Sequence, residues 1–564
     1  MPGAFFIFRN FVFCAAFCDI LPAGNIVPAV SIEQLELIFL LLLVFVVALA
    51  AFAKRLDIPY PIVLVVGGLV LSFIPHVPKI ELSPDLVFLV ILPPLLFSAA
   101  FLTSWRDFRY NLVSITMLAL GLVAFTVQGV AAAAHWMLPG FTWQLGLVLG
   151  AVVCTTDAIA ATAIARRLGL PQRLVDILEG ESLVNDASGL LALQLATAVV
   201  MTGHMPTLSE RLARLLYLIG GSIVIGLVLG KVVRLVLEKI DDAQIEITIS
   251  VIAPYFAYLT AESLHGSGVL ATVVCGLYLG HTSSAYLSIG ARLQGGAVWE
   301  TLTFVLNGVV FLLMGLQLPY VLADINTIRL GRLILHGLML SAIVILLRML
   351  WMYPGAWIAN RIRRRLFHQQ EPLPSARAVL VAGWTGMRGV VALAAAISLP
   401  ETLNDGTPFP HRAVIIFLTY CVIFVTLVLQ GLTLPPLIRW LGLANPVGKD
   451  EEEIKARREI IEAALAYLEH SREDDRPDFA PVYDDLIRLQ LGRLTLVQDD
   501  AKDGRDYGLE NFQRYTEINR KVLALQRAVL LKLRNEEKIN DQVLRRLETE
   551  LDLVAARNAS LEAQ

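Results

Sequence analysis

The stretch Glu181-Ser182-Leu183-Val184-Asn185-Asp186 lies inside an apolar segment that is long enough to cross a membrane. A carboxylate near the centre of a bilayer is costly, so such a group is usually retained for a function. At about 100° per residue, Ser182 and Asp186 lie one turn apart on a helix, as do Glu181 and Asn185. The four side chains therefore share one helix face with two carboxylates, a hydroxyl and an amide. Hard monovalent cations prefer such oxygen ligands.

The composition is that of a membrane protein with a polar C-terminal part. The chain has 564 residues, of which 56% are hydrophobic and 17% are charged, whereas soluble domains average about 25% charged residues. Residues 449–564 hold 20 basic and 26 acidic residues, and the preceding part holds 26 basic and 23 acidic ones. The acidic tail and nearly balanced membrane part argue against nucleic acid as a partner.

Thirteen apolar windows predict an all-α, polytopic membrane protein. The windows lie at 34–53, 60–75, 85–103, 110–137, 143–165, 174–203, 212–237, 245–261, 266–282, 298–319, 328–358, 376–399 and 412–440. If the charged tail is cytoplasmic, the cytoplasmic loops hold sixteen basic residues and the opposite loops hold six. This bias follows the positive-inside rule and predicts an N-terminus on the outside.

Two of these windows contain polar interruptions at corresponding places. The fifth window contains Cys154-Thr155-Thr156-Asp157, and the twelfth contains Gly383-Trp384-Thr385-Gly386-Met387-Arg388-Gly389. Thirteen helices divide into two six-helix repeats and one helix between them, which places these two windows at equivalent positions. Transporters built from inverted repeats carry broken helices at such positions. The sequence therefore predicts two inverted six-helix repeats with broken crossing helices.

The two ends of the chain differ from the membrane part at 34–445. Residues 1–33 form an N-terminal extension that is either signal-like or peripheral. Residues 446–564 read as a small cytoplasmic helical domain, because about 40% of the residues after 448 are charged and helical patterns recur. The expected helical runs lie at 454–469, 515–534 and 542–556. An amphipathic stripe is predicted within the second of these runs, at Leu523, Leu525, Val529, Leu530 and Leu533.

Three motifs carry a family resemblance. They are Thr156-Asp157, the segment from Glu179 to Asp186, and Gly386-Met387-Arg388-Gly389-Val390-Val391-Ala392-Leu393. Together with weaker matches at 92–97 and 258–270, they resemble the monovalent cation:proton antiporter-1 family, the sodium/proton exchangers, and particularly its bacterial members. The resemblance covers roughly residues 34–440. It implies a thirteen-helix fold, a homodimer, and exchange of sodium, or in some members lithium or potassium, for protons.

The resemblance also assigns the cation- and proton-binding residues. It implies that the carboxylate of Asp186 is shared by the cation and the proton. Asn185 stands where electrogenic relatives carry a second aspartate, which implies electroneutral exchange. Asp157, Thr156 and Ser182 match ion ligands of the family, so the implied sodium site comprises Asp186, Asp157, Ser182 and Thr156. The alternatives are a helix cap for Asp157 and, for Ser182, a hydrogen bond to the preceding turn.

An arginine inside the twelfth window needs a partner. Glu181 is a carboxylate near the midplane besides Asp186, and relatives join the equivalent residues, so we predict a Glu181–Arg388 ion pair. Two positions depart from the family pattern. Ala158 stands where many relatives have proline, and Ser98 stands where several relatives have an acidic residue, so no carboxylate ligand is expected there.

These observations predict a secondary active cation:proton antiporter that works by alternating access, and not an enzyme. No cofactor is expected beyond the transported ions, and the expected partners are monovalent cations, protons, the lipid bilayer and a second copy of the chain. The expected location is the plasma membrane, with a cytoplasmic C-terminal tail. A potassium:proton antiporter, a cation channel and a membrane sensor are the alternatives. A channel would need an open path and a filter, whereas the paired breaks favour a transporter.

Overall fold

The computed structural model describes residues 32–74, 82–202, 208–323, 330–368, 374–444, 451–497 and 507–536, and a few residues between 547 and 555. The predicted extension at 1–33 therefore lies almost wholly outside the described residues. Within the described ranges the regular structure is helical, apart from one isolated antiparallel bridge between Thr402 and Pro408. The prediction of an all-α protein is confirmed. The chain divides into two compact units, residues 1–446 and 447–564.

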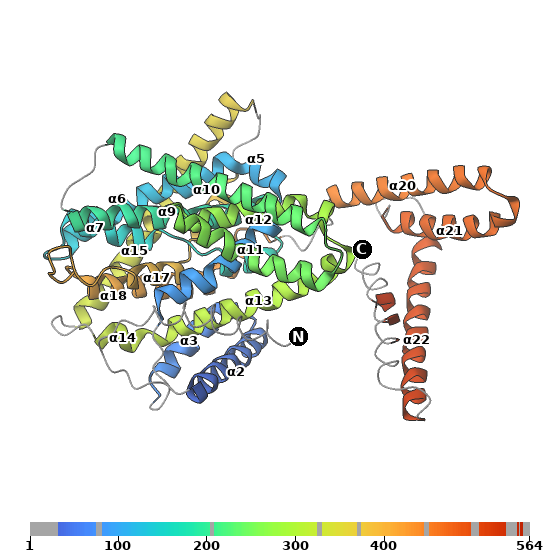
Figure 1. The fold of residues 1–564 in the computed structure, drawn as a ribbon, viewed down its shortest axis with the longest axis horizontal. Helices are drawn as coiled ribbons and strands as arrows, with labels where there is room; N and C mark the ends of the chain where they lie inside the picture. Colours follow the sequence, from blue (N-terminus) through green and yellow to red (C-terminus); the bar gives the residue numbers. More distant parts are fainter. Residues whose placement is uncertain are drawn as a thin grey trace, which may run out of the picture. The chain divides into compact units, whose positions relative to one another are not determined.

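The first unit is a bundle of apolar helices (Figure 1). Its first part contains α2 (Ile32–Leu56), α3 (Tyr60–Ser72), η1 (Leu86–Ile91), α4 (Leu92–Leu102), α5 (Trp105–Thr116), η2 (Met117–Leu122), α6 (Val123–Met137), α7 (Trp143–Val153), α8 (Ile159–Arg167) and α9 (Gln172–Thr202). Its second part contains α10 (Leu208–Leu237), α11 (Ala243–Ser263), α12 (Gly268–Tyr286), α13 (Ile289–Leu316), α14 (Leu318–Ala323), α15 (Leu330–Leu366), α16 (Ala376–Trp384), α17 (Val390–Ile397), α18 (Arg412–Val425), η3 (Thr426–Gln430) and α19 (Gly431–Trp440).

Each of the thirteen predicted windows coincides with one helix or with helices in close succession. Among the described residues, seven helices are long and apolar enough to cross a membrane, and three apolar helices are shorter. In three windows a π-helical stretch, η1, η2 or η3, continues directly into an α-helix. The multi-pass helical fold is therefore confirmed, while the number of crossings and the inverted repeat stay predictions.

Two windows contain an interrupted helix. The chain leaves helical structure between α7 and α8, at residues 154–158, and between α16 and α17, at residues 385–389. Threonine and aspartate side chains compete for backbone hydrogen bonds, and glycine disfavours a helix, so both polar segments unwind easily. Non-helical backbone is tolerated at membrane depth where it is buried in protein or lines a cavity. Both interruptions lie where the sequence predicts them.

Small residues let neighbouring helices of the first unit approach closely. Gly68 of α3 and Gly315 of α13 face each other, and a Cβ atom on either one would overlap backbone of the opposite helix. Gly146 and Gly150 of α7 lie in the same way against the backbone of α6. In lipid, where helix association depends on packing and hydrogen bonds, close approach of this kind stabilises helix pairs. These glycines thus hold α3 close to α13 and α7 close to α6.

The second unit consists of α20 (Glu451–Asp474), a short 3₁₀ turn η4 (Pro477–Phe479), α21 (Ala480–Val497) and α22 (Tyr507–Asn535). α20 and α21 pack side by side (Figure 1), and Arg472 and Asp484 form an ion pair between them at 3.1 Å. The predicted stripe divides between two faces of α22, because Leu523 and Leu530 are buried whereas Leu525 and Val529 are exposed. The predicted run at 542–556 lies mostly outside the described residues.

Candidate cation and proton site

The two interrupted helices meet at their unwound segments. The backbone N–H of Asp157 donates a hydrogen bond to the carbonyl oxygen of Met387 at 2.8 Å. The guanidinium of Arg388 donates to the carbonyl of Val153, the last residue of α7, at 3.1 Å, and to the carbonyl of Gly386. The C-terminal end of a helix carries partial negative charge. Arg388 therefore stabilises the carbonyl groups that α7 and α16 leave free where they stop.

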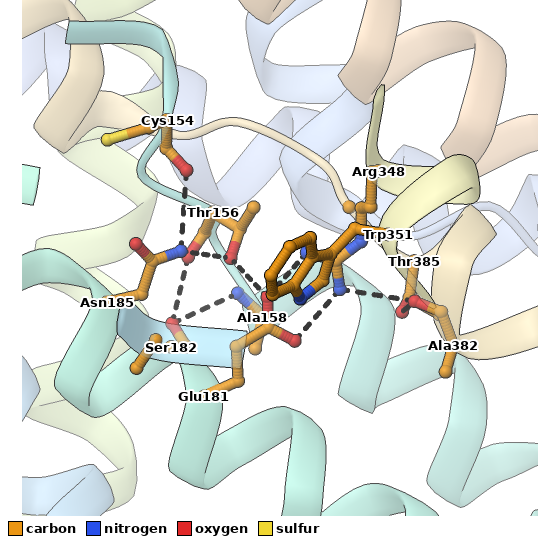
Figure 2. A network of polar contacts seen from close by, with 12 residues as sticks. Cys154, Thr156, Ala158, Glu181, Ser182, Asn185, Arg348, Trp351, Ala382 and Thr385 are labelled. Atoms are coloured by element: carbon orange, nitrogen blue, oxygen red, sulfur yellow. Dashed lines mark hydrogen bonds and ion pairs between the residues drawn. The ribbon is translucent and has the colours of Figure 1, made fainter. Parts of the chain in front are cut away.

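The helix α9 holds one of these segments through two side chains, as Figure 2 shows. The amide nitrogen of Asn185 donates to the Thr156 hydroxyl at 2.9 Å and to the Cys154 carbonyl at 3.4 Å. The hydroxyl of Ser182 donates to the Thr156 carbonyl at 3.1 Å and accepts from the N–H of Ala158 at 3.4 Å. The polar face predicted for α9 thus lies against the break between α7 and α8.

A cavity of about 220 Å³ lies beside this junction and contains both predicted carboxylates, Asp157 and Asp186. Its polar lining comes from the interrupted helix, from α4 and from α13, through Thr155, Ser98, Thr303 and Asn307. Asp186 is buried, with 7% of its surface exposed. These two aspartates, 29 positions apart in the sequence, therefore line one cavity, and their role as the cation and proton site stays a prediction.

The two carboxylates differ in their hydrogen bonding. One oxygen of Asp157 accepts from the backbone N–H of Ile159 at 2.8 Å, so this side chain caps the start of α8 while it lines the cavity. Gly389 leaves room for it, because a Cβ atom there would overlap the Asp157 carboxylate. No described residue donates a hydrogen bond to the Asp186 carboxylate. Asp157 is thus held by the backbone, whereas the Asp186 carboxylate has no hydrogen-bond donor among the described residues.

The cavity chemistry suits a small hard cation. Sodium and potassium are bound by oxygen atoms, and the lining offers carboxylate, hydroxyl and amide oxygens. The hydroxyl of Thr155 is buried, and none of the described residues is its hydrogen-bond partner. A buried polar atom without a partner is costly, and an ion or a water bound beside Thr155 would satisfy it. Thr155 was not among the residues predicted from the sequence, although it is the first of three consecutive polar residues at the break.

The predicted Glu181–Arg388 ion pair is wrong. Glu181 pairs with Arg348 of α15 through both carboxylate oxygens, at 2.5 and 2.9 Å. Thr156 also donates to this carboxylate, at 3.3 Å (Figure 2). Both charged side chains are 1% exposed, so each neutralises the other in a place that excludes water. Arg388 is satisfied by the carbonyl groups of the junction instead.

Arg348, the partner of Glu181, was not predicted from the sequence. It is an arginine inside the apolar run of α15, which is the signal that could have identified it. A charge in a membrane helix faces the protein interior and takes a partner. Arg348 and Arg388 are therefore both possible partners of Glu181, and their positions in the sequence do not show which of them forms the ion pair. The position of α15 beside α16 decides it, since Arg348 also donates to the Ala382 carbonyl at 3.1 Å.

The remaining predicted residues, Thr156, Ser182 and Asn185, are not among the residues that line the cavity. The hydroxyls of Thr156 and Ser182 and the amide of Asn185 are engaged in the hydrogen bonds that hold the break. Their predicted roles as direct ligands stay predictions. In the described conformation they position the unwound segment that carries Asp157.

Comparison with known proteins identifies the family to which this chain is similar. Residues 40–440 match the family described as "Sodium/hydrogen exchanger, transmembrane". The chain is 33% identical to an uncharacterized Na(+)/H(+) exchanger of Mycobacterium tuberculosis, over 91% of this chain and 95% of the relative. It is 30% identical to the sodium, potassium, lithium and rubidium/H(+) antiporter of Bacillus pumilus, over 86% of this chain and 72% of that protein.

The fold has a solved counterpart. The sodium proton antiporter MjNhaP1 of Methanocaldococcus jannaschii superposes with a TM-score of 0.56 at 20% sequence identity, over 72% of this chain and 98% of that one. At this identity the likeness concerns the fold. The family match, by contrast, spans the breaks, the two aspartates and the buried ion pair. On the extent of that match, this chain belongs to the family of transmembrane sodium/hydrogen exchangers.

Proposed function

We propose that the protein is a secondary antiporter that exchanges sodium for protons through the carboxylate of Asp186. The observation that carries this proposal is the buried cavity in which Asp186 and Asp157 lie together at the junction of two interrupted helices. A protonated carboxylate has a much lower affinity for a cation, because the proton neutralises the charge that would bind the cation. Asp186 would carry one or the other, and this exclusion would couple the two fluxes.

The surrounding residues support electroneutral exchange. Asn185, next to Asp186, is an uncharged amide that holds the break. The second charge on that helix face, Glu181, is neutralised by Arg348. Asp157 is held at the start of α8 by the backbone N–H of Ile159. We propose that Asp186 is the carboxylate that exchanges its ion in each cycle, so one cation would leave for each proton that enters.

Alternating access would open the cavity to each side of the membrane in turn. The cavity is lined by residues of both interrupted helices and α9, and by residues of α4 and α13. We propose that the interrupted helices and α9 move as one body against α4 and α13. The hydrogen bond between Asp157 and Met387 and the Arg388 contacts would keep the two interrupted helices together during this movement.

The cation could also be potassium or lithium. The name of the Bacillus pumilus relative includes sodium, potassium, lithium and rubidium, which favours a broad cation range as the second candidate. The cavity lining also includes a neutral polar side chain, Ser98. We further propose that the protein acts as a homodimer in the plasma membrane, with its N-terminus outside and its tail in the cytoplasm.

Reconstitution tests this function. The full-length protein would be placed in proteoliposomes that contain a pH-sensitive dye, and sodium, lithium and potassium would be added separately. We expect sodium to release protons from acid-loaded vesicles, and the flux to reverse when the imposed gradients are reversed. Proton movement that ignores all three cations, or cation flux without coupled proton movement, would overturn the proposal. The second result is the one expected of a channel.

A further inference from the structure

An apolar cavity separate from the ion site lies among α5, η2, α9, α10 and α12. Its volume is about 540 Å³, within the range of roughly 300–1,000 Å³ that small-molecule sites occupy. Most of its lining is aliphatic or aromatic. Two hydroxyls in the lining are already satisfied, because Ser188 donates to the Ala119 carbonyl at 2.6 Å and Ser267 accepts from the Leu270 N–H at 3.3 Å. The walls therefore suit a hydrocarbon occupant.

The cavity is elongated along its helices. On α5 and η2 its lining runs from Trp105 to Leu120, and on α12 it runs from Ser267 to His281. At about 1.5 Å per residue, each of these stretches is roughly 20 Å long. The hydrocarbon layer of one leaflet is about half of the ~30 Å core of a bilayer. A groove of this length between membrane helices fits one extended acyl chain.

One end of the cavity has the residues of a membrane interface. Trp105 and His281 lie there in ring contact, with centroids 6.4 Å apart. Tyr278 lines the same end, and the guanidinium of Arg234 on α10 interacts with its hydroxyl and pairs with Glu238 at 2.7 Å. Tryptophan and tyrosine are enriched where lipid headgroups begin. The remaining N–H groups of Arg234 can donate to a lipid phosphate at this end.

We propose that this cavity binds one anionic phospholipid. Its acyl chain would fill the groove, and its phosphate would lie at the end formed by Trp105, Tyr278 and His281, near Arg234. The bilayer supplies such a molecule at high local concentration, so no soluble ligand is required. The occupant would also contact α9 beside the ion site, since Val184 and Ala187 line the cavity and flank Asp186.

Two adjacent residues of α10 provide a matched test of the acyl-chain site. Ile223 lines the cavity, whereas Val224 is 60% exposed on the outer side of the same helix. Ile223→Trp should fill the groove, and Val224→Trp adds the same side chain outside it. The full-length protein would be purified in detergent, washed to remove loosely held lipid, supplied with phosphatidylglycerol and measured by native mass spectrometry.

We expect the wild-type protein and Val224→Trp to retain one phospholipid per chain and Ile223→Trp to lose it. Equal retention by the two variants, or no retained lipid in the wild type, would overturn the proposal. Lipid binding is read without transport, so this result is independent of the test of exchange. A melting curve for each variant shows that Ile223→Trp is folded.

The headgroup is tested with a second lipid that has the same acyl chains. Phosphatidylglycerol should bind at least tenfold more tightly than phosphatidylcholine, and Arg234→Gln should reduce this preference. Quenching of Trp105 fluorescence by brominated acyl chains reports occupancy, with Trp105→Phe identifying the signal. Equal affinity for the two lipids in the wild type would overturn the anionic assignment.

Discussion

At the scale of single residues, the two aspartates of the cavity have different surroundings. Asp157 accepts a backbone hydrogen bond, whereas no described residue donates to Asp186. Asp186→Asn should abolish exchange in proteoliposomes while the melting temperature in detergent changes little, because the variant removes the charge that cation and proton share. Asp241→Asn, the same change at an exposed position, should leave exchange intact. Cation-dependent proton flux in Asp186→Asn at any pH would contradict the assignment.

The buried Glu181–Arg348 pair makes a prediction about stability. Arg348→Gln should destabilise the protein by about 3–5 kcal/mol, because it leaves a carboxylate without its partner in a place that excludes water. The double variant with Glu181→Gln should be milder, since no lone charge remains. Melting in detergent measures both. Arg458→Gln is the control, because both side chains of its pair with Glu462 are exposed and surface pairs contribute roughly 0–1 kcal/mol. If the single and double variants melt alike, the pair is not an energetic unit.

At the scale of elements, the junction of the interrupted helices depends on close approach. A Cβ atom at Gly389 would overlap the Asp157 carboxylate, so Gly389→Ala should displace Asp157 and weaken cation binding. We expect a KM for the cation that rises at least tenfold, with the protein still folded. Gly220→Ala on α10 is the control, because a Cβ there has open space around it. An unchanged KM in Gly389→Ala would mean that the position of Asp157 is unimportant for binding.

Much of this arrangement could be predicted from the sequence, because hydropathy and helical period are local properties. The apolar windows and the breaks at 154–158 and 385–389 follow from such patterns. The partner of Glu181 could not be predicted in this way. It depends on how α15 lies against α9 and α16, and two arginines in apolar windows satisfied the same local argument. Thr155 and Asn307 likewise join the site through packing of separate helices.

At the scale of the whole molecule, the proposed cation and proton ligands all precede residue 447, where the second unit begins. The first unit contains the cavity, the junction and the ion pair. The second unit is rich in charged residues, and many of its described ion pairs lie at solvent-exposed helix positions. Such a unit is suited to regulation or assembly rather than to ion passage.

Truncation after Pro446 tests this division. We expect the shortened protein to retain exchange in proteoliposomes, with a changed pH dependence or a less stable dimer if the tail regulates or assembles. Size-exclusion chromatography and melting establish first that the truncated protein is folded and monodisperse. Asp186→Asn in the truncated protein provides the inactive control, which separates true exchange from leak. If a well-folded truncated protein shows no exchange at any pH, residues 34–440 are not the complete transport unit, and the tail must take part in the transport cycle itself.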